Sequence, residues 1–403
     1  MKRLLLVVGF LLLFATEILR VYFIMPFPGS QRSNSIDLAY FIDRNRLWLR
    51  IAGFVLVGYA LLIFPTKRRN PYTTPRRKSN WPGILLSIVA LLYAVVFYYF
   101  NYRFEADIMF HQPHTIAYAD STNRSINQRR LVIGLVVNNR AKAYPIQLIG
   151  YHHQVRDTLG NTPIMVTYCT VCRTGRVYSP LVHGRPEEFR LVGMDHFNAM
   201  FEDESTKSWW RQATGEAIAG PLKGERLAEL PSGQYTLKEW LLMHPDSRIM
   251  LPDPADTSHY ANLKNYDDGT IDGGLEHRDS SSWKPKSWVV GVVAGNFAKA
   301  YDWNWVSSHR FTEDTIGALP VLIYYTDSNF CVLGRTAGGH ILGFNRHSDP
   351  AVLTDTTTGS VWNASGLCVS GPLKGQQLQP LQSYQEFWHS WSYFHPTTTQ
   401  YNP

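Results

Sequence analysis

The feature that most constrains the fold is a stretch of the chain that occurs twice. The segment IGLVVNNRAKAY (133–144) resembles VGVVAGNFAKAY (290–301), and the pentapeptide GPLKG occurs at 220–224 and again at 371–375. A unit of roughly 120 residues that occurs twice predicts two related domains and not a solenoid.

Both copies have the pattern of a mainly-β domain. Residues 131–148 alternate as strand, turn and strand, with Asn138 and Asn139 at a turn that tolerates positive φ. Further strands are expected around 163–169, 175–180, 188–193 and 214–219. A capping box from Thr236 to Glu239, and another from Ser383 to Glu386, predict a short closing helix in each copy.

Three apolar runs near the N-terminus, at about 4–25, 47–64 and 83–100, are each long enough to cross a membrane. No small-residue cleavage pattern follows the first run, so we interpret it as a retained helix and not a signal peptide. The loop 67–78 carries six Lys/Arg and no acid, and positive loops stay in the cytoplasm. We therefore expect a multi-pass protein of the cell membrane with a cytoplasmic N-terminus and with residues after about 101 extracytoplasmic.

The net charge of +7 does not indicate nucleic-acid binding, because the excess of basic residues lies in the N-terminal region that contains the three apolar runs. Residues 1–100 hold 13 Lys+Arg and 3 Asp+Glu, whereas residues 101–403 hold 26 and 29. The larger region therefore lacks the basic surface that nucleic acid requires, and we predict the membrane as a partner but no nucleic acid. Four cysteines are also too few for a disulfide scaffold.

The predicted fold is an N-terminal three-helix membrane module followed by a mainly-β (α+β) soluble region made of two homologous tandem domains. We expect the membrane module at 1–103, a first repeat domain with a Cys-x-x-Cys at 104–250, a linker at 251–287, and a second repeat domain without the Cys-x-x-Cys at 288–403.

The Cys-x-x-Cys is the strongest candidate for chemistry. Cys169 and Cys172 follow the apolar strand PIMVTY, and loops after strand ends often carry functional residues. Arg173 stands where c-type haem attachment needs a histidine, so no c-type haem is expected. A redox pair, a soft-metal site and an inert structural disulfide remain open. The second copy has Thr326 and Asn329 at the matching places, which favours a functional pair.

Nearby side chains suit a soft metal such as copper, because imidazole, thioether and thiolate are its preferred ligands. Arg173 would favour thiolates electrostatically, and with the two cysteines it is a candidate catalytic residue. His152 recurs as His309 in the second copy, which is also typical of a structural histidine. The candidate metal ligands are Cys169, Cys172, His152, His196, Met194 and Met200.

Several motifs together resemble one bacterial family. They are AKAYP, His152 with Asp157, TYCxxCxTG, a Trp followed by TGEAIAGPLKG, and a closing Trp with HPD. The combination resembles the family called domain of unknown function 3179 over about residues 130–400, in both copies. The resemblance implies the domain but no activity. The family pattern has a Gly or similar small residue where this chain has Arg173.

The sequence therefore predicts a membrane-anchored extracytoplasmic protein of unknown activity with a redox or soft-metal site at Cys169 and Cys172. The alternative is a non-catalytic envelope binding or structural module with a structural disulfide. The pairing of Cys331 and Cys368, the metal, the substrate and any protein or small-molecule partner are not specified by the sequence.

Overall fold

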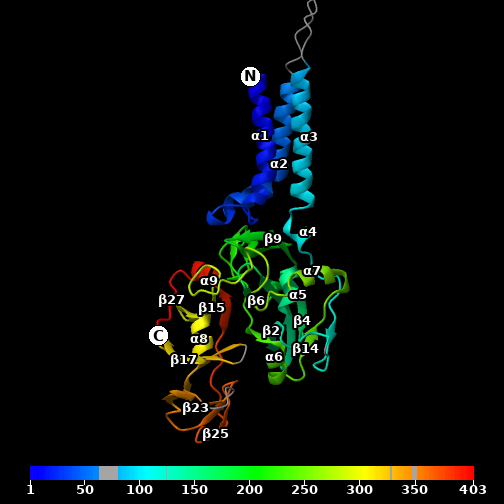
Figure 1. The fold of residues 1–403 in the computed structure, drawn as a ribbon. Helices are drawn as coiled ribbons and strands as arrows, with labels where there is room; N and C mark the ends of the chain where they lie inside the picture. Colours follow the sequence, from blue (N-terminus) through cyan, green and yellow to red (C-terminus); the bar gives the residue numbers. More distant parts are fainter. Residues whose placement is uncertain (63–79, 124, 327–328, 347–351) are drawn as a thin grey trace, which may run out of the picture. The chain divides into compact units, whose positions relative to one another are not determined.

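The computed structural model describes residues 1–62, 80–123, 125–326, 329–346 and 352–403, and the chain in it divides into two compact units (Figure 1). The first unit comprises residues 1–111, 189–210 and 217–224. The second comprises residues 112–188, 211–216 and 225–403. The basic loop 67–78, on which the predicted orientation depends, lies outside the described residues.

The first unit begins with three helices long and apolar enough to cross a membrane, α1 (Lys2–Tyr22), α2 (Ile36–Leu62) and α3 (Trp81–Tyr102). The three predicted spans are thus confirmed as helices. The segment 26–46 between the first two predicted spans is a helix from Ile36 onward. Its early residues are helical because Ala39 and Ile42 are buried, with Ala39 in a core cluster that also contains Ile24.

Charged side chains join the three helices within the bundle. Arg50 forms two bonds of 2.7 Å to the carboxylate of Glu17, which is fully buried. Asn101 accepts a bond of 2.7 Å from Arg50 and donates one of 2.9 Å to Glu17. Ionised groups are costly in an apolar environment unless they are paired, so this network favours one arrangement of the helices.

The rest of the first unit is a four-stranded sheet, preceded by the short elements η1 (Ser30–Arg32) and α4 (Ala106–Met109). In the order β12-β11-β10-β9 its strands are β12 (Ala217–Ala219), β11 (Trp209–Arg211), β10 (Asn198–Asp203) and β9 (Phe189–Asp195). Val192, Met200 and Trp209 from the sheet pack with Ile24 and Ala39 in one core cluster. The helices and this sheet therefore share a core.

The second unit contains two series of elements whose order and pairing recur. In the earlier series, β13 and β3 flank β2, β14 pairs parallel to β3, and β4-β5-β6 form a three-stranded sheet. Its bounds are β1 (Tyr118–Ala119), β2 (Leu131–Val137), β3 (Arg140–Pro145), α5 (Ile146–His152), β4 (Gln154–Leu159), β5 (Thr162–Cys169), β6 (Thr174–Tyr178), β7 (Leu181–Val182), β8 (Arg185–Pro186), β13 (Ser232–Thr236), α6 (Leu237–Met243) and β14 (Arg248–Met250).

In the later series, β26 and β16 flank β15, β27 pairs parallel to β16, and β17-β18-β19 form the three-stranded sheet. A further sheet, β22-β23-β24-β25, has the antiparallel order of β9 to β12. The bounds are β15 (Trp288–Ala294), β16 (Phe297–Asp302), α8 (Trp303–His309), β17 (Phe311–Ile316), β18 (Leu319–Tyr325), β19 (Phe330–Gly334), β20 (Thr336–Ala337), β21 (His340–Ile341), β22 (Phe344–Arg346), β23 (Val352–Asp355), β24 (Val361–Asn363), β25 (Cys368–Ser370), β26 (Ser383–Phe387), α9 (Trp388–Phe394) and β27 (Thr399–Gln400).

Some side-chain contacts also occur at matching places in the two series. A Cβ built on Gly134 would lie 2.3 Å from the ring of Trp240, and one built on Gly291 would lie 2.2 Å from the ring of Trp391. In each series the strand has a glycine at this position, so the Trp of the closing helix packs directly on the strand backbone. The GPLKG turns also match, because Gly220 and Gly371 both have φ of 98°.

The two series meet within the second unit along β13 and β26. The side-chain amide of Gln234 donates to the carbonyl of Gln385 at 3.2 Å, and Gln385 donates to the carbonyl of Gln234 at 3.2 Å. Ser232 and Gln382 exchange a similar pair of bonds. Reciprocal bonds of this kind relate the two strands by an approximate two-fold axis. The segment 251–287 follows β14 and contains η2 (Pro254–Asp256) and α7 (Thr257–Asn262).

Candidate functional site

The Cys-x-x-Cys lies at the end of β5 and in the connection to β6. Cys169 is the last residue of β5 and pairs with Thr174, the first residue of β6. Arg173 has φ of 57°, and this left-handed residue returns the chain to the sheet. Both cysteines are fully buried, and they lie 4.0 Å apart with no disulfide between them.

The closing helix of the later series packs against this connection. The backbone N–H of Phe387 donates to the carbonyl of Cys172 at 3.0 Å, and the Ser390 side chain is hydrogen-bonded to the Cys172 thiol. The ammonium of Lys286 donates to the carbonyl of Val171 at 2.7 Å. The Nε2 atom of His389 lies 3.1 Å from the same carbonyl. One polar side chain thus contacts a buried thiol directly, and two more bind the backbone between the cysteines.

Burial determines the protonation of these groups. It raises the pKa of the Cys172 thiol well above the usual range, the neighbouring Cys169 raises it further, and Lys286 and Ser390 act in the opposite direction. Burial lowers the pKa of Lys286. Burial, together with the charge of Lys286, lowers the pKa of His389 to about 4. At neutral pH the site therefore holds a protonated Cys172 thiol beside a neutral His389 imidazole.

The spacing of the thiols bears on their chemistry. A disulfide requires a sulfur separation of roughly 2.05 Å, so the pair at 4.0 Å is not bonded. The predicted alternative of a structural disulfide therefore does not describe this structure. Two sulfurs 4.0 Å apart can both reach one ion at bond lengths of roughly 2.3 Å. Cys331 and Cys368 are also free.

Arg173 does not have the role expected from the sequence, which was to favour thiolates at the two cysteines. Its guanidinium stacks over the rings of Trp288 at 4.0 Å and Trp303 at 4.9 Å. The cation whose charge acts on the Cys172 thiol is Lys286. Arg173 thus packs the Cys-x-x-Cys connection onto the core of the later series.

The other candidate metal ligands lie in different surroundings. His152 is fully buried in α5, with Nε2 2.7 Å from the hydroxyl of Tyr260. His196, Met194 and Met200 belong to the first unit, whereas the thiols belong to the second. The Nδ1 atom of His196 lies 2.7 Å from Asp195, and Met200 is part of the buried core of that unit.

Sequence reasoning missed Lys286, His389 and Ser390. Lys286 is at the end of the segment 251–287, and the other two are in a helix more than 200 residues after the cysteines. Only the pairing of the two series brings them to the thiols. No local sequence signal marks them, and Lys286 and His389 are only half-buried in the structure.

The later series has a shorter connection at the corresponding place. The N–H of Thr326 donates to the carbonyl of Asn329 at 2.9 Å, so Asn329 faces Thr326 as Thr174 faces Cys169. Thr326 donates a hydrogen bond to Glu239 in α6, the helix that corresponds to α9. A hydroxyl–carboxylate contact thus takes the place of the contact between thiol and Ser390.

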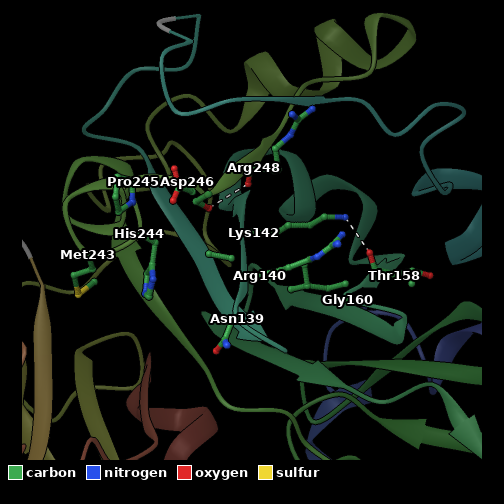
Figure 2. A pocket seen from close by; sticks show the side chains of 13 residues that line it. Asn139, Arg140, Lys142, Thr158, Gly160, Met243, His244, Pro245, Asp246 and Arg248 are labelled. Atoms are coloured by element: carbon green, nitrogen blue, oxygen red, sulfur yellow. Dashed lines mark hydrogen bonds between the residues drawn. The ribbon is translucent and has the colours of Figure 1, made fainter.

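An open hollow of about 550 Å³ lies elsewhere in the second unit (Figure 2). Its basic side chains are Arg140, Lys142 and Arg248, with His244 on the other side. Lys142 is already bound to the Asp157 carboxylate at 2.5 Å. Asp157 also accepts a bond from Tyr144, and in the later series Asp314 has the same kind of contacts with Lys299 and Tyr301. These groups therefore support the sheet in both series.

A family model described as "Protein of unknown function (DUF3179)" matches residues 110–398. No curated protein and no solved structure matches the chain. The match covers both series of elements except β27 and includes Lys286, Ser390 and His389 beside the thiols.

Proposed function

The chain belongs to the family described as protein of unknown function (DUF3179), and from its thiol site we propose that it is a membrane-anchored protein that binds a soft metal ion, of the copper(I) kind, through Cys169 and Cys172. The single observation that carries this proposal is the pair of buried thiols 4.0 Å apart with no disulfide between them, near a lysine and a neutral histidine. We infer no catalytic step.

The charges around the thiols support a metal complex. A copper(I) ion held by two thiolates carries one net negative charge, which the ammonium of Lys286 would balance. The hydroxyl of Ser390, which donates to the Glu386 carboxylate at 3.1 Å and is also hydrogen-bonded to Cys172, would be an outer-shell group beside the metal-bound sulfur. Binding replaces two thiol protons by the ion, so a raised thiol pKa is compatible with metal affinity, although it makes that affinity dependent on pH.

Burial disfavours the redox hypothesis. Exchange between thiols and disulfides starts from an accessible thiolate. Both sulfur-bearing residues are fully buried, and the pKa of Cys172 is raised. A cycling disulfide would therefore need an opening of the site in each turnover, whereas a bound ion needs only one opening for entry.

We further infer that the two series arose from one duplicated unit and that only the first copy retained the site. The recurring strand order, the two Gly–Trp contacts and the reciprocal amide bonds support this inference. The loss of the cysteines in a copy that keeps its core indicates that the pair is not required for folding.

The metal-binding proposal is tested with the full chain purified in detergent and titrated with copper(I) against a chromophoric chelator. We expect one tightly bound ion per chain, and we expect its loss in a Cys169→Ser/Cys172→Ser variant. The matched control is Cys331→Ser, which removes a thiol of the later series and should bind copper(I) like the wild type. Equal binding by the double variant and the wild type would refute the proposal.

The orientation is a separate proposal, in which everything after about residue 101 lies outside the cytoplasm. It rests on three spans and on six basic residues in the loop between the second and third. A reporter that is active only in the cytoplasm should be silent when fused after Pro403 and active when inserted in the loop 67–78. An active C-terminal fusion would reverse the assignment.

A further inference from the structure

A second hollow, of about 480 Å³, lies in the second unit where the two series meet. The first series lines it with β6 and the segments 211–216 and 226–229, and the later series with β15, β26 and α9. The thiol site uses none of the charged side chains of this hollow, which are those of Arg176, Arg211, Glu216, Arg226 and Glu229.

On one side of the hollow, two guanidinium groups share one carboxylate. The Oε2 atom of Glu216 lies 3.2 Å from Nη2 of Arg226 and 3.9 Å from Nη1 of Arg211. The second distance is too long for a hydrogen bond. The guanidinium of Arg211 also lies over the ring of Phe394, 5.0 Å from its centroid. These two arginines and one glutamate together carry one positive charge.

On the other side, Arg176 faces two carboxylates. It forms the buried pair with Glu386, and its Nε atom lies 3.7 Å from Oε1 of Glu229. The Tyr384 hydroxyl donates to Glu229 at 3.2 Å, and burial raises the pKa of the Glu229 carboxyl. Carboxylates of the chain thus already occupy the side of Arg176, so an added anion would be bound on the side of Arg211 and Arg226.

Apolar surface lies beside these arginines. Val293 and Tyr393 are 42% and 43% exposed, and the Phe394 ring is half-buried under the Arg211 guanidinium. A hollow that combines exposed apolar side chains with a few charged groups is typical of a site for a small organic ligand.

The later series forms the same backbone contacts without these charges. The bridge between Glu216 and Arg226 corresponds to the one between Leu367 and Gln377. In each series the first partner stands four residues before the GPLKG turn and the second stands two residues after it. The GPLKG region therefore folds in the same way with a charged or an uncharged pair.

The remaining charged residues of the hollow follow the same rule. The backbone N–H of Arg211 donates to the carbonyl of Glu216 at 2.8 Å, as that of Asn363 does to Leu367 at 3.0 Å. By strand register and bridges, the counterparts of Arg176, Arg211, Glu216, Arg226 and Glu229 are Cys331, Asn363, Leu367, Gln377 and Pro380. All five counterparts are uncharged, so the backbone of this region forms without the charges, which points to a role in binding.

We propose that this hollow binds a small organic anion whose oxyanion group, a carboxylate or a phosphate, lies on Arg211 and Arg226. The apolar part of the ligand lies against Val293, Tyr393 and Phe394. A planar guanidinium matches such oxyanions because it donates two parallel N–H bonds. The proposal does not depend on the metal site at the thiols.

The test uses the full chain in detergent and saturation-transfer NMR titrations with benzoate, phenyl phosphate and the neutral analogue benzamide. We expect at least one of the two anions to bind about 10-fold more tightly than benzamide, because hydrogen bonds between charged groups are stronger than neutral ones. The anion that binds more tightly identifies the oxyanion group.

The variants place residues of the later series in the hollow. Arg226→Gln and Arg211→Asn should each weaken binding of that anion by about 10-fold or more. The Arg226 side chain is 67% exposed, so its substitution should leave the fold intact, which an unchanged urea unfolding midpoint will check. Arg185→Gln, which changes an exposed arginine in β8, is the control and should bind like the wild type.

Three results would overturn the proposal. They are the absence of binding by both anions, binding of benzamide as tight as that of both anions, and an unchanged affinity in Arg226→Gln.

Discussion

An Asp355→Ala variant is expected to lose on the order of 4 kcal/mol of unfolding free energy. The Asp355 carboxylate accepts bonds from Trp362 Nε1 at 2.9 Å and from the backbone N–H of Ser360 at 3.1 Å. It also accepts from the backbone and the hydroxyl of Thr358. Alanine leaves these donors without an acceptor, and Trp362 is fully buried.

The measurement is urea-induced unfolding of the full chain in detergent, followed by Trp fluorescence. The control is Asp120→Ala, which removes an exposed carboxylate whose bonds go to the neighbouring Thr122 and Asn123 and should leave the midpoint nearly unchanged. The account of this carboxylate would be wrong if Asp355→Ala unfolded at the same urea concentration as Asp120→Ala.

Asp355 also makes stability depend on pH. Burial alone would raise the pKa of its carboxyl, but the bonds from Trp362, Thr358 and Ser360 lower it below the usual value. Because the folded pKa is below the unfolded one, the stabilisation is present above about pH 4 and is lost as pH falls from there through the folded pKa. An Asp355→Asn variant should therefore lose less stability than the wild type between neutral and acidic pH.

The second large effect is expected for Arg176→Met. The guanidinium of Arg176 donates to the carboxylate of Glu386, and the two side chains are 2% and 0% exposed. Removing Arg176 leaves a buried carboxylate without a cation, which typically costs about 3–5 kcal/mol. Because the pair joins β6 of the first series to β26 of the later one, the substitution should weaken the contact between them.

The same unfolding measurement applies, with Glu225→Gln as the control because the pair of His183 and Glu225 is exposed and should contribute less than about 1 kcal/mol. A double variant, Arg176→Met/Glu386→Leu, should recover much of the loss, since it removes the fully buried carboxylate with its cation and leaves only the partly exposed Glu229 without one. A loss below about 1 kcal/mol for Arg176→Met would show that the pair does not stabilise the contact.

Much of the architecture was predictable because it depends on local patterns. Apolar runs predicted the three helices near the N-terminus, and period-two alternation with Asn138 and Asn139 at a turn predicted the hairpin of β2 and β3. The capping box at Thr236 opens α6 as expected. The start of α2 was missed because Ile36 to Arg46 is not apolar and is helical through packing of one face.

The surroundings of the thiols were not predictable, because they depend on which distant segments meet. From the sequence, His196 and two methionines were expected as metal ligands because they lie near the cysteines in the chain. The fold places them in the first unit, whereas the cysteines belong to the second. Lys286 and Ser390 reach the cysteines only through the pairing of the two series. The sequence also matched Asn329 to Cys172, because it assumed the same spacing in both copies. The connection between the two strands is shorter in the later series, so Asn329 does not occupy the place of Cys172.

The most direct test of the central claim is the X-ray absorption spectrum of the copper(I)-loaded full chain. We predict a first shell dominated by sulfur, and its replacement by nitrogen and oxygen or the loss of copper in the Cys169→Ser/Cys172→Ser variant, with no change in Cys331→Ser. A wild-type spectrum without sulfur neighbours, or a sulfur shell that persists in the double variant, would contradict a soft-metal site at Cys169 and Cys172.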